Sequence, residues 1–107
     1  MKTSELTGAA LDWAVAQCEG LDEREYVEID NLYGAKWRGP EYSTDWAQGG
    51  PIIERECMEF DYDEGPQTYR AFNGINGAEG KTHLIAAMRC LVSSKLGDEI
   101  EVPEELL

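Results

Sequence analysis

The clearest periodic pattern in the chain lies near its C-terminus, where apolar residues recur every three or four positions. These residues are Leu84, Ile85, Met88, Leu91, Val92 and Leu96. Such spacing places them on one face of a helix, which Thr82 can cap and Gly97 can end. The sequence therefore predicts a helix from Thr82 to Leu96 at the centre of the core.

A second helical pattern runs from Thr7 to Glu19. Its apolar positions are Ala10, Leu11, Ala14, Val15 and Cys18. Thr7 or Ser4 can cap this helix and Gly20 can end it. Because alanine allows close approach, we expect the helix to pack against a sheet.

Shorter alternating patterns between the two helices predict strands. They cover Tyr26 to Asp30, Ile52 to Met58 and Thr68 to Phe72. Segments without such a period are predicted as irregular segments, turns or loops. These are Asn31 to Pro40, Tyr42 to Pro51, Glu59 to Gly65 and Asn73 to Gly80.

The order of these elements predicts an α+β fold, a small antiparallel sheet packed against two α-helices. A chain of 107 residues has room for one compact core, so we expect a single domain spanning 1–107. No apolar run approaches the ~20 residues of a membrane span, and no secretory signal is visible.

Charge limits the partners that the protein can have. The chain carries 22 acidic and 9 basic residues, a net charge of -13, which repels nucleic acid phosphates. We therefore expect no direct nucleic acid binding and no membrane partner. The acidic surface could attract a basic host protein, imitate the charge of DNA, or serve solubility alone.

Metal and thiol chemistry have little support in the sequence. Cys18, Cys57 and Cys90 show no CxxC spacing and are expected to be free thiols in a reducing compartment. His83 is the single histidine, which excludes a histidine-rich metal site and leaves no recognisable catalytic triad. We expect no cofactor and no enzyme activity.

The densest group of functional side chains lies between Tyr42 and Glu56. A ligand-binding loop needs an apolar plate, fixed polar groups and free backbone donors. Trp46 could stack on a ring, and Asp45 could accept hydrogen bonds from sugar hydroxyls or an exocyclic amine. Gly49 and Gly50 could offer backbone amides, and Arg55 could hold a phosphate. The predicted ligand-binding residues are Ser43, Thr44, Asp45, Trp46, Gln48, Gly49, Gly50 and Arg55. The alternative places Trp46 in the core and pairs the arginine with a glutamate.

The residues Gly80, Lys81 and Thr82 at the start of the predicted C-terminal helix resemble the end of a phosphate-binding loop motif. The motif requires a glycine at the position of Ile75, and Gly74 comes one residue too early. Two interpretations remain open. Lys81 could help hold an anion at the helix start, or the segment is an ordinary capped helix.

Three blocks of the sequence resemble a known family. TSELTGAALDWAVAQCEG, STDWAQGGPIIERE and LIAAMRCLVSSKLGDEIEVPEEL are similar to the NinX-like proteins of tailed bacteriophages, a family of unknown biochemical function. Family members carry Gly-Pro-Thr-Pro where this chain has Gly80 to His83, so the resemblance implies no anion role for Lys81. It implies a small phage accessory protein made in the bacterial host cytoplasm.

These observations lead to one functional hypothesis and two alternatives. We expect a non-enzymatic protein that binds and sequesters a small polar host ligand, derived from a nucleotide, in a pocket shared between the subunits of a homo-oligomer. The first alternative is an acidic protein inhibitor or DNA-charge mimic acting on a host protein. The second is a small hydrolase.

Overall fold

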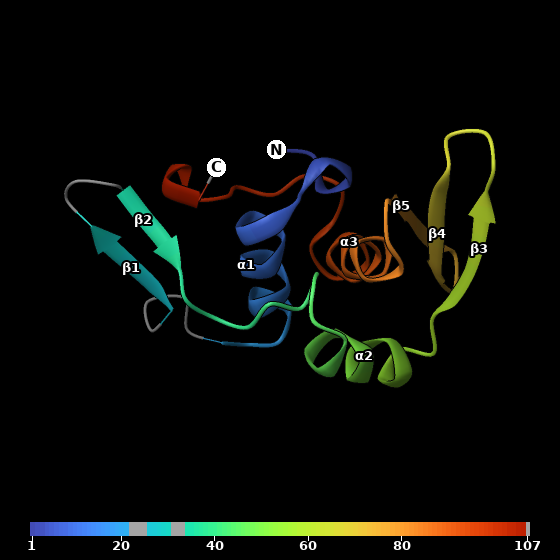
Figure 1. Ribbon diagram of the computed structural model, residues 1–107, viewed down its shortest axis with the longest axis horizontal. Coiled ribbons are helices and arrows are strands. Elements are labelled where there is room, and N and C mark those ends of the chain that lie inside the picture. The colour runs from blue at the N-terminus through green and yellow to red at the C-terminus, as the bar shows by residue number, and fades with distance from the viewer. Residues whose placement is uncertain (22–25, 31–33, 107) are drawn as a thin grey trace.

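The computed structural model describes residues 1–21, 26–30 and 34–106. Figure 1 shows two long helices at the centre, a three-stranded sheet on one side and a two-stranded hairpin on the other. The elements are η1 (Thr3–Glu5), α1 (Gly8–Cys18), β1 (Val27–Asp30), β2 (Gly34–Trp37), α2 (Trp46–Arg55), β3 (Glu59–Asp63), β4 (Thr68–Asn73), β5 (Asn76–Gly80), α3 (His83–Leu96) and η3 (Glu104–Leu106). The predicted α+β fold is confirmed.

The larger sheet is antiparallel in the order β3-β4-β5. Its register pairs Phe60 with Ala71 and Tyr62 with Tyr69. Because side chains alternate between the two faces of a sheet, these residues share one face. Ala71 is fully buried on that face, which packs against α3.

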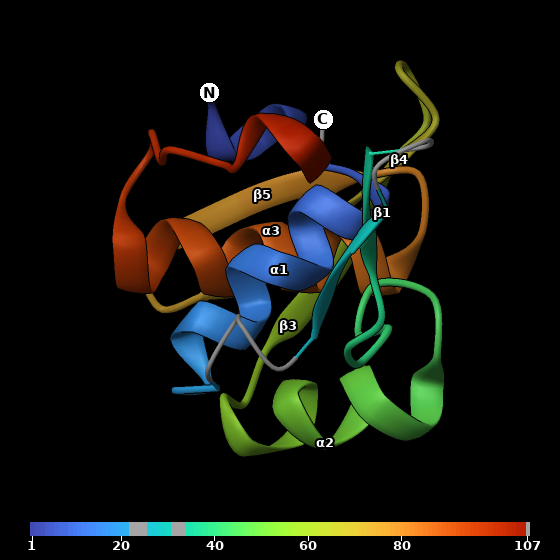
Figure 2. The same ribbon diagram turned by 90° about the vertical axis from the view of Figure 1, so that its left-hand side faces the viewer.

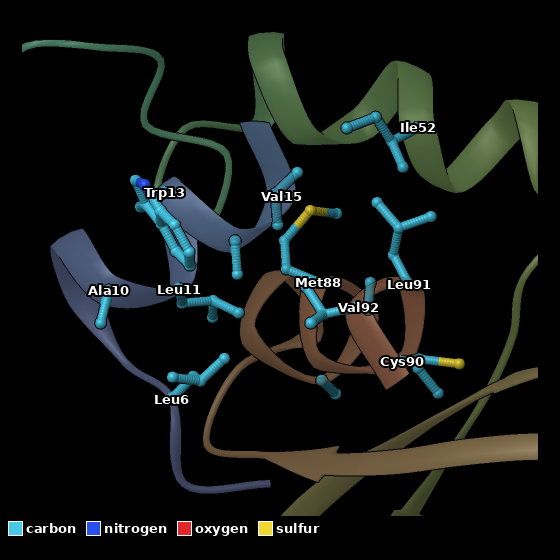
Figure 3. Packing of buried hydrophobic residues seen from close by; sticks show 14 residues of the cluster. Leu6, Ala10, Leu11, Trp13, Val15, Ile52, Met88, Cys90, Leu91 and Val92 are labelled. Carbon is cyan, nitrogen blue, oxygen red and sulfur yellow. The ribbon is translucent and has the colours of Figure 1, made fainter. Parts of the chain in front are cut away.

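The hydrophobic core is centred on α3, as predicted. Met88, Leu91 and Val92 are fully buried, and Figure 3 shows Met88 beside Val15 of α1 and Leu91 pointing toward Ile52 of α2. The Thr82 hydroxyl accepts a hydrogen bond from the Ile85 N–H at 3.1 Å, which confirms the predicted cap. Gly97 ends the helix with a φ of 91°, a conformation that glycine adopts without a steric penalty.

The helix α1 confirms the predicted N-terminal helix but has a different neighbour. It packs on α3 on one side and contacts β2 on the other, as Figures 1 and 2 both show. The larger sheet is covered by α3 itself. The residue before the helix, Thr7, makes no side-chain capping hydrogen bond.

The predictions for the middle of the chain were wrong in several places. The predicted loop Tyr42 to Pro51 and the predicted strand Ile52 to Met58 together contain one helix, α2. Gly49, Gly50 and Pro51 are poor helix formers, so local propensity hid a helix that tertiary packing stabilises.

Three further segments are strands where turns, loops or irregular chain were predicted. The acidic segment Glu59 to Gly65 begins with β3. Its run of carboxylates is also typical of a solvated turn, which is why the strand was missed. Asn73 to Gly80 contains β5, whose glycines suggested a loop. Asn31 to Pro40 contains β2, and its residues 31–33 lie outside the described residues.

The three cysteines are free thiols, as the sequence predicted. Cys90 is buried, Cys18 is half-buried and Cys57 is exposed. Burial raises the pKa of the Cys18 thiol to about 11, so this thiol stays protonated at neutral pH.

Candidate functional site

The start of α2 is held by Asp45, one of the predicted ligand-binding residues. Its Oδ1 accepts from the Ala47 N–H at 2.9 Å, and the Gln48 amide donates to Oδ2 at 2.9 Å. Both bonds lower the pKa of the Asp45 carboxyl, and the bond from Gln48 has the larger effect. One oxygen of Asp45 therefore caps the helix, and the other binds the Gln48 side chain.

Gly49 allows α2 to pack closely on its neighbours, whereas the sequence suggested that its backbone amide is free to bind a ligand. Its N–H donates to the Asp45 carbonyl at 2.8 Å. A Cβ at this position would lie 2.7 Å from a Leu84 methyl group and would clash with the Tyr42 carbonyl. Only glycine lets α2 approach α3 this closely. Gly50 lies in the same helix and has open space around it, apart from an ordinary contact with the Trp46 ring.

Ser43 is buried and ties the segment before α2 to α1. Its N–H donates to the Asp12 carboxylate at 2.9 Å, and both residues are almost fully buried. Burial raises the pKa of Asp12, and the bond from the Ser43 N–H partly opposes that rise. Thr44 is exposed, and its N–H donates to the Glu41 carbonyl at 3.2 Å.

Arg55 lies at the end of α2 and is paired with carboxylates. Its two terminal nitrogens bind Glu19 at 2.8 and 3.0 Å, and Glu56 lies 3.6 Å away. These partners raise the pKa of Arg55, and the hydrogen bonds to Glu19 have the largest effect. The pairing matches the alternative that the sequence left open for this arginine.

Trp46, by contrast, lies on the surface and belongs to a group of aromatic rings. The centroid of its ring lies 6.2 Å from that of His83. The centroids of the His83 and Tyr69 rings lie 3.9 Å apart, with the two rings tilted by 34°. Phe60 approaches His83 edge-on at 5.2 Å, and Tyr62 lies 5.0 Å from Tyr69. We call these five residues, Trp46, Phe60, Tyr62, Tyr69 and His83, the aromatic surface.

Exposure separates Trp46 from the other tryptophans. Trp46 is 57% exposed, whereas Trp13 is 8% exposed within the core. Trp37 is half-buried, and its indole N–H donates to the Pro40 carbonyl at 3.0 Å. Of the two positions considered for Trp46, core or surface, the structure shows the surface.

Sequence reasoning missed four members of the aromatic surface. Phe60 and Tyr62 alternate along β3, and Tyr69 is the cross-strand partner of Tyr62. Had residues 59–73 been predicted as a β-hairpin, these three side chains would have been placed on one face of it. The approach of His83 and Trp46 depends on the packing of α2 against α3, which no local pattern encodes.

Metal and membrane features are absent from the part of the chain that the structure describes. Within residues 1–21, 26–30 and 34–106, no three His, Cys, Asp or Glu side chains gather as a metal site requires. In the same ranges, no helix has the length and apolar character needed to cross a bilayer.

Comparison with known families places the chain. The family model described as "Bacteriophage P22, NinX" matches residues 2–95. The chain belongs to this family. Within the described residues, the match spans α1, α2, the strands β1 to β5 and most of α3. It confirms the resemblance seen in the sequence and makes this a bacteriophage protein. A search of curated proteins gave no match.

Proposed function

We propose that this protein is a non-enzymatic phage accessory protein that binds and sequesters a small polar host ligand on its aromatic surface. The ligand carries a planar ring, as nucleotide derivatives do, and Trp46 is the residue on which the ring stacks. The observation that supports this proposal is the exposure of Trp46 beside a continuous series of rings. The expected place of action is the cytoplasm of the bacterial host.

The aromatic surface suits a flat ligand for a physical reason. Aromatic side chains bury large areas when a planar ring covers them, and each stacked base contributes roughly 1–3 kcal/mol. Trp46 and Tyr62 are 57% and 49% exposed, so they have area left to bury. His83 and Tyr69 lie between them and fix their spacing.

The residues predicted around Trp46 take revised roles. Asp45, Ser43 and Gly49 hold the helix that carries the tryptophan, as their contacts indicate. Thr44 is exposed and Gln48 half-exposed next to Trp46, so both remain candidates for polar contacts. Arg55 is paired with Glu19 and is no longer assigned to a phosphate.

An open aromatic surface becomes an enclosed site when a second copy covers it. We therefore propose a homo-oligomer in which the aromatic surfaces of two subunits enclose the ligand. Native mass spectrometry of protein purified from infected cells measures the subunit number and any retained small molecule together.

The test compares Trp46→Ala with Ile75→Ala, which removes a fully exposed side chain at the β4–β5 turn. Wild type and Ile75→Ala are expected to retain the same small molecule in native mass spectra. Trp46→Ala is expected to bind it about ten- to a hundredfold more weakly, because one stacking contact is lost. Melting temperatures confirm that both variants are folded.

Two outcomes would contradict the proposal. One is a wild-type protein that takes up no small molecule, either from infected cells or from host metabolite extract in calorimetry. The other is unchanged ligand retention in a folded Trp46→Ala variant. A protein that instead captures a basic host protein, with an affinity falling steeply as salt rises, would be the acidic inhibitor.

A further inference from the structure

The larger sheet has an edge at β5 and an edge at β3, and the two differ in what covers them. At the β5 edge, the Arg89 guanidinium donates to the Glu79 carbonyl at 2.9 Å and to the Leu6 carbonyl at 2.8 Å. Arg89 therefore occupies this edge and joins it to the N-terminal segment. β3 lies at the opposite edge, outermost in Figure 1, and within the described residues it pairs with β4 alone.

The hydrogen bond to Glu79 also fixes which peptide groups β3 presents at its free edge. In an antiparallel ladder, successive residues direct their N–H and C=O groups to opposite edges, and two paired residues point either toward each other or both away. Glu79 points away from β4, so its partner Arg70 points toward β3. Asp61, the partner of Arg70 in β3, therefore points toward β4. Its neighbours Phe60 and Tyr62 point to the free edge.

The free edge of β3 thus carries the N–H and C=O groups of Phe60 and Tyr62. Among the described residues, no hydrogen bond from a turn, loop or cap reaches these groups. Two residues before Phe60, the Met58 N–H donates to the Ile53 carbonyl at 3.2 Å, so that donor is already used. A strand edge with unpaired backbone groups is a template on which another strand can pair.

The side chains along this edge form an aromatic face and an acidic face. Phe60 and Tyr62 lie on the face that carries the aromatic surface, and Tyr62 is half-exposed. Glu59, Asp61 and Asp63 alternate with them and lie on the outer face of the sheet. A strand added here would therefore meet rings on one face and carboxylates on the other.

Charge decides which strand fits the acidic face. Asp61 is bound by Arg70 through two hydrogen bonds of 2.6 Å, and one oxygen of Asp63 accepts from the Gly65 N–H at 3.0 Å. Within the described residues, Glu59 and Asp63 form no ion pair. A second copy paired edge to edge would place carboxylates opposite carboxylates, which destabilises a sheet. Lysine or arginine opposite Glu59 and Asp63 would be attracted, in a chain with a net charge of -13.

We propose that the free edge of β3 binds an extended segment of a basic partner protein as an additional antiparallel strand. The backbone of the segment bonds to the N–H and C=O groups of Phe60 and Tyr62. Its apolar side chains pack on those two rings, and its alternate lysine or arginine side chains lie beside Glu59 and Asp63. In such strand addition, the backbone bonds supply affinity and the alternate side chains supply specificity. The proposal needs neither Trp46 nor a small ligand, so it goes beyond the function proposed above.

Synthetic peptides test the proposal by NMR at constant ionic strength. The probe is the acetylated and amidated peptide Lys-Val-Lys-Val-Lys. We expect it to shift the Phe60 and Tyr62 N–H signals in a saturable way and to slow the exchange of both amides with deuterated water. The control peptide Lys-Lys-Lys-Val-Val has the same composition and charge without the alternation. It is expected to bind about three- to tenfold more weakly, because its side chains cannot match both faces.

Backbone methylation of the probe separates strand addition from general charge attraction. Methyl groups on the valine nitrogens remove the N–H groups that face β3. They are expected to weaken binding about ten- to a hundredfold, because backbone hydrogen bonds are lost. A methyl group on the central lysine nitrogen lies on the far side of the added strand. That peptide is the matched control and should bind as the unmodified probe does.

Charge reversal in the protein tests the acidic face. Glu59→Lys is expected to bind the lysine probe about three- to tenfold more weakly, and to bind Glu-Val-Glu-Val-Glu more tightly than wild type does. Glu101→Lys makes the same change in net charge at an exposed position of the C-terminal segment and is the matched control. It should bind both peptides as wild type does. Melting temperatures report whether the variants are folded.

Any of four results would overturn the proposal. They are the absence of saturable shifts at Phe60 and Tyr62, equal affinity for the alternating and the control peptide, unchanged affinity after valine methylation, and equal affinity in folded Glu59→Lys and Glu101→Lys. The peptide series uses the wild-type protein, so it decides the question even if Glu59→Lys fails to fold.

Discussion

The helices α3 and α2 cross each other and yet are held in place by different means. α3 buries seven residues, including Met88, Leu91 and Val92, whereas α2 buries only Gly49 and Ile52. Figure 3 shows Ile52 as the side chain by which α2 reaches the core. α3 is therefore positioned by apolar packing, and α2 by a cap, two isoleucines, one glycine contact and the ion pair of Arg55 with Glu19. This difference leaves α2 free to present Trp46 to solvent.

The largest expected effect comes from Leu91→Ala in α3. Leu91 is fully buried, so removing its methyl groups loses apolar burial and leaves a cavity. We expect a loss of about 2–5 kcal/mol in the free energy of unfolding. Urea denaturation monitored by circular dichroism measures it.

The matched change in α2 is Trp46→Ala, which removes a larger but exposed side chain. It is expected to cost less than about 1 kcal/mol, as surface substitutions usually do. Equal losses for the two variants would show that Trp46 supports the fold as Leu91 does. The contrast between the helices would then be lost.

The same contrast explains what the sequence could predict. α3 and α1 have apolar positions at helical spacing and β4 alternates, so local patterns located them. α2 contains Gly49, Gly50 and Pro51, which disfavour a helix locally, and Gly49 packs on Leu84, a residue that is distant in sequence. β5 is built from Asn76-Gly-Ala-Glu-Gly80 and becomes a strand only because β4 and α3 flank it.

The candidate site was predictable to a similar degree. The density of functional groups singled out the stretch that contains Trp46, which the structure shows to be exposed. The same pattern could not show that Asp45 and Arg55 use their charges within the fold. His83 and Tyr69 join Trp46 through tertiary packing alone.

Gly49→Ala is expected to have an intermediate effect on the contact between the two helices. Its Cβ would meet the Tyr42 carbonyl and a Leu84 methyl group, so α2 must shift away from α3. We expect a loss of about 1–3 kcal/mol, typical of overpacking. Chemical denaturation measures the loss, and the indole N–H signal of Trp46 in NMR spectra reports the shift of α2.

Gly50→Ala is the control for that experiment, since its Cβ meets only a Trp46 ring carbon at 3.8 Å. Alanine is the better helix former, so this variant is expected to gain up to about 1 kcal/mol. If both glycine variants change stability in the same direction, the close approach at Gly49 does not hold α2 in place.

The smallest expected effect concerns Asp12, which connects α1 to the segment before α2 through Ser43. Burial raises its pKa above the ordinary value of 3.8. Below that value the carboxyl is protonated in both the folded and the unfolded chain, and burial carries no charge penalty. As pH rises through the window between the unfolded and the folded pKa, the unfolded chain releases its proton first. The free energy of unfolding therefore falls through this window and becomes constant above the folded pKa.

Asp12→Asn removes this titration while keeping an oxygen that can accept from the Ser43 N–H. The other acidic residues are common to both proteins, so their titration cancels in the difference. From about pH 4 to pH 7, the stability of wild type relative to Asp12→Asn is expected to decline and then level off. Urea melts of both proteins across this range measure the difference. A difference that stays constant with pH would mean that Asp12 titrates normally. The hydrogen bond from the Ser43 N–H would then fully offset the cost of burying the Asp12 carboxylate.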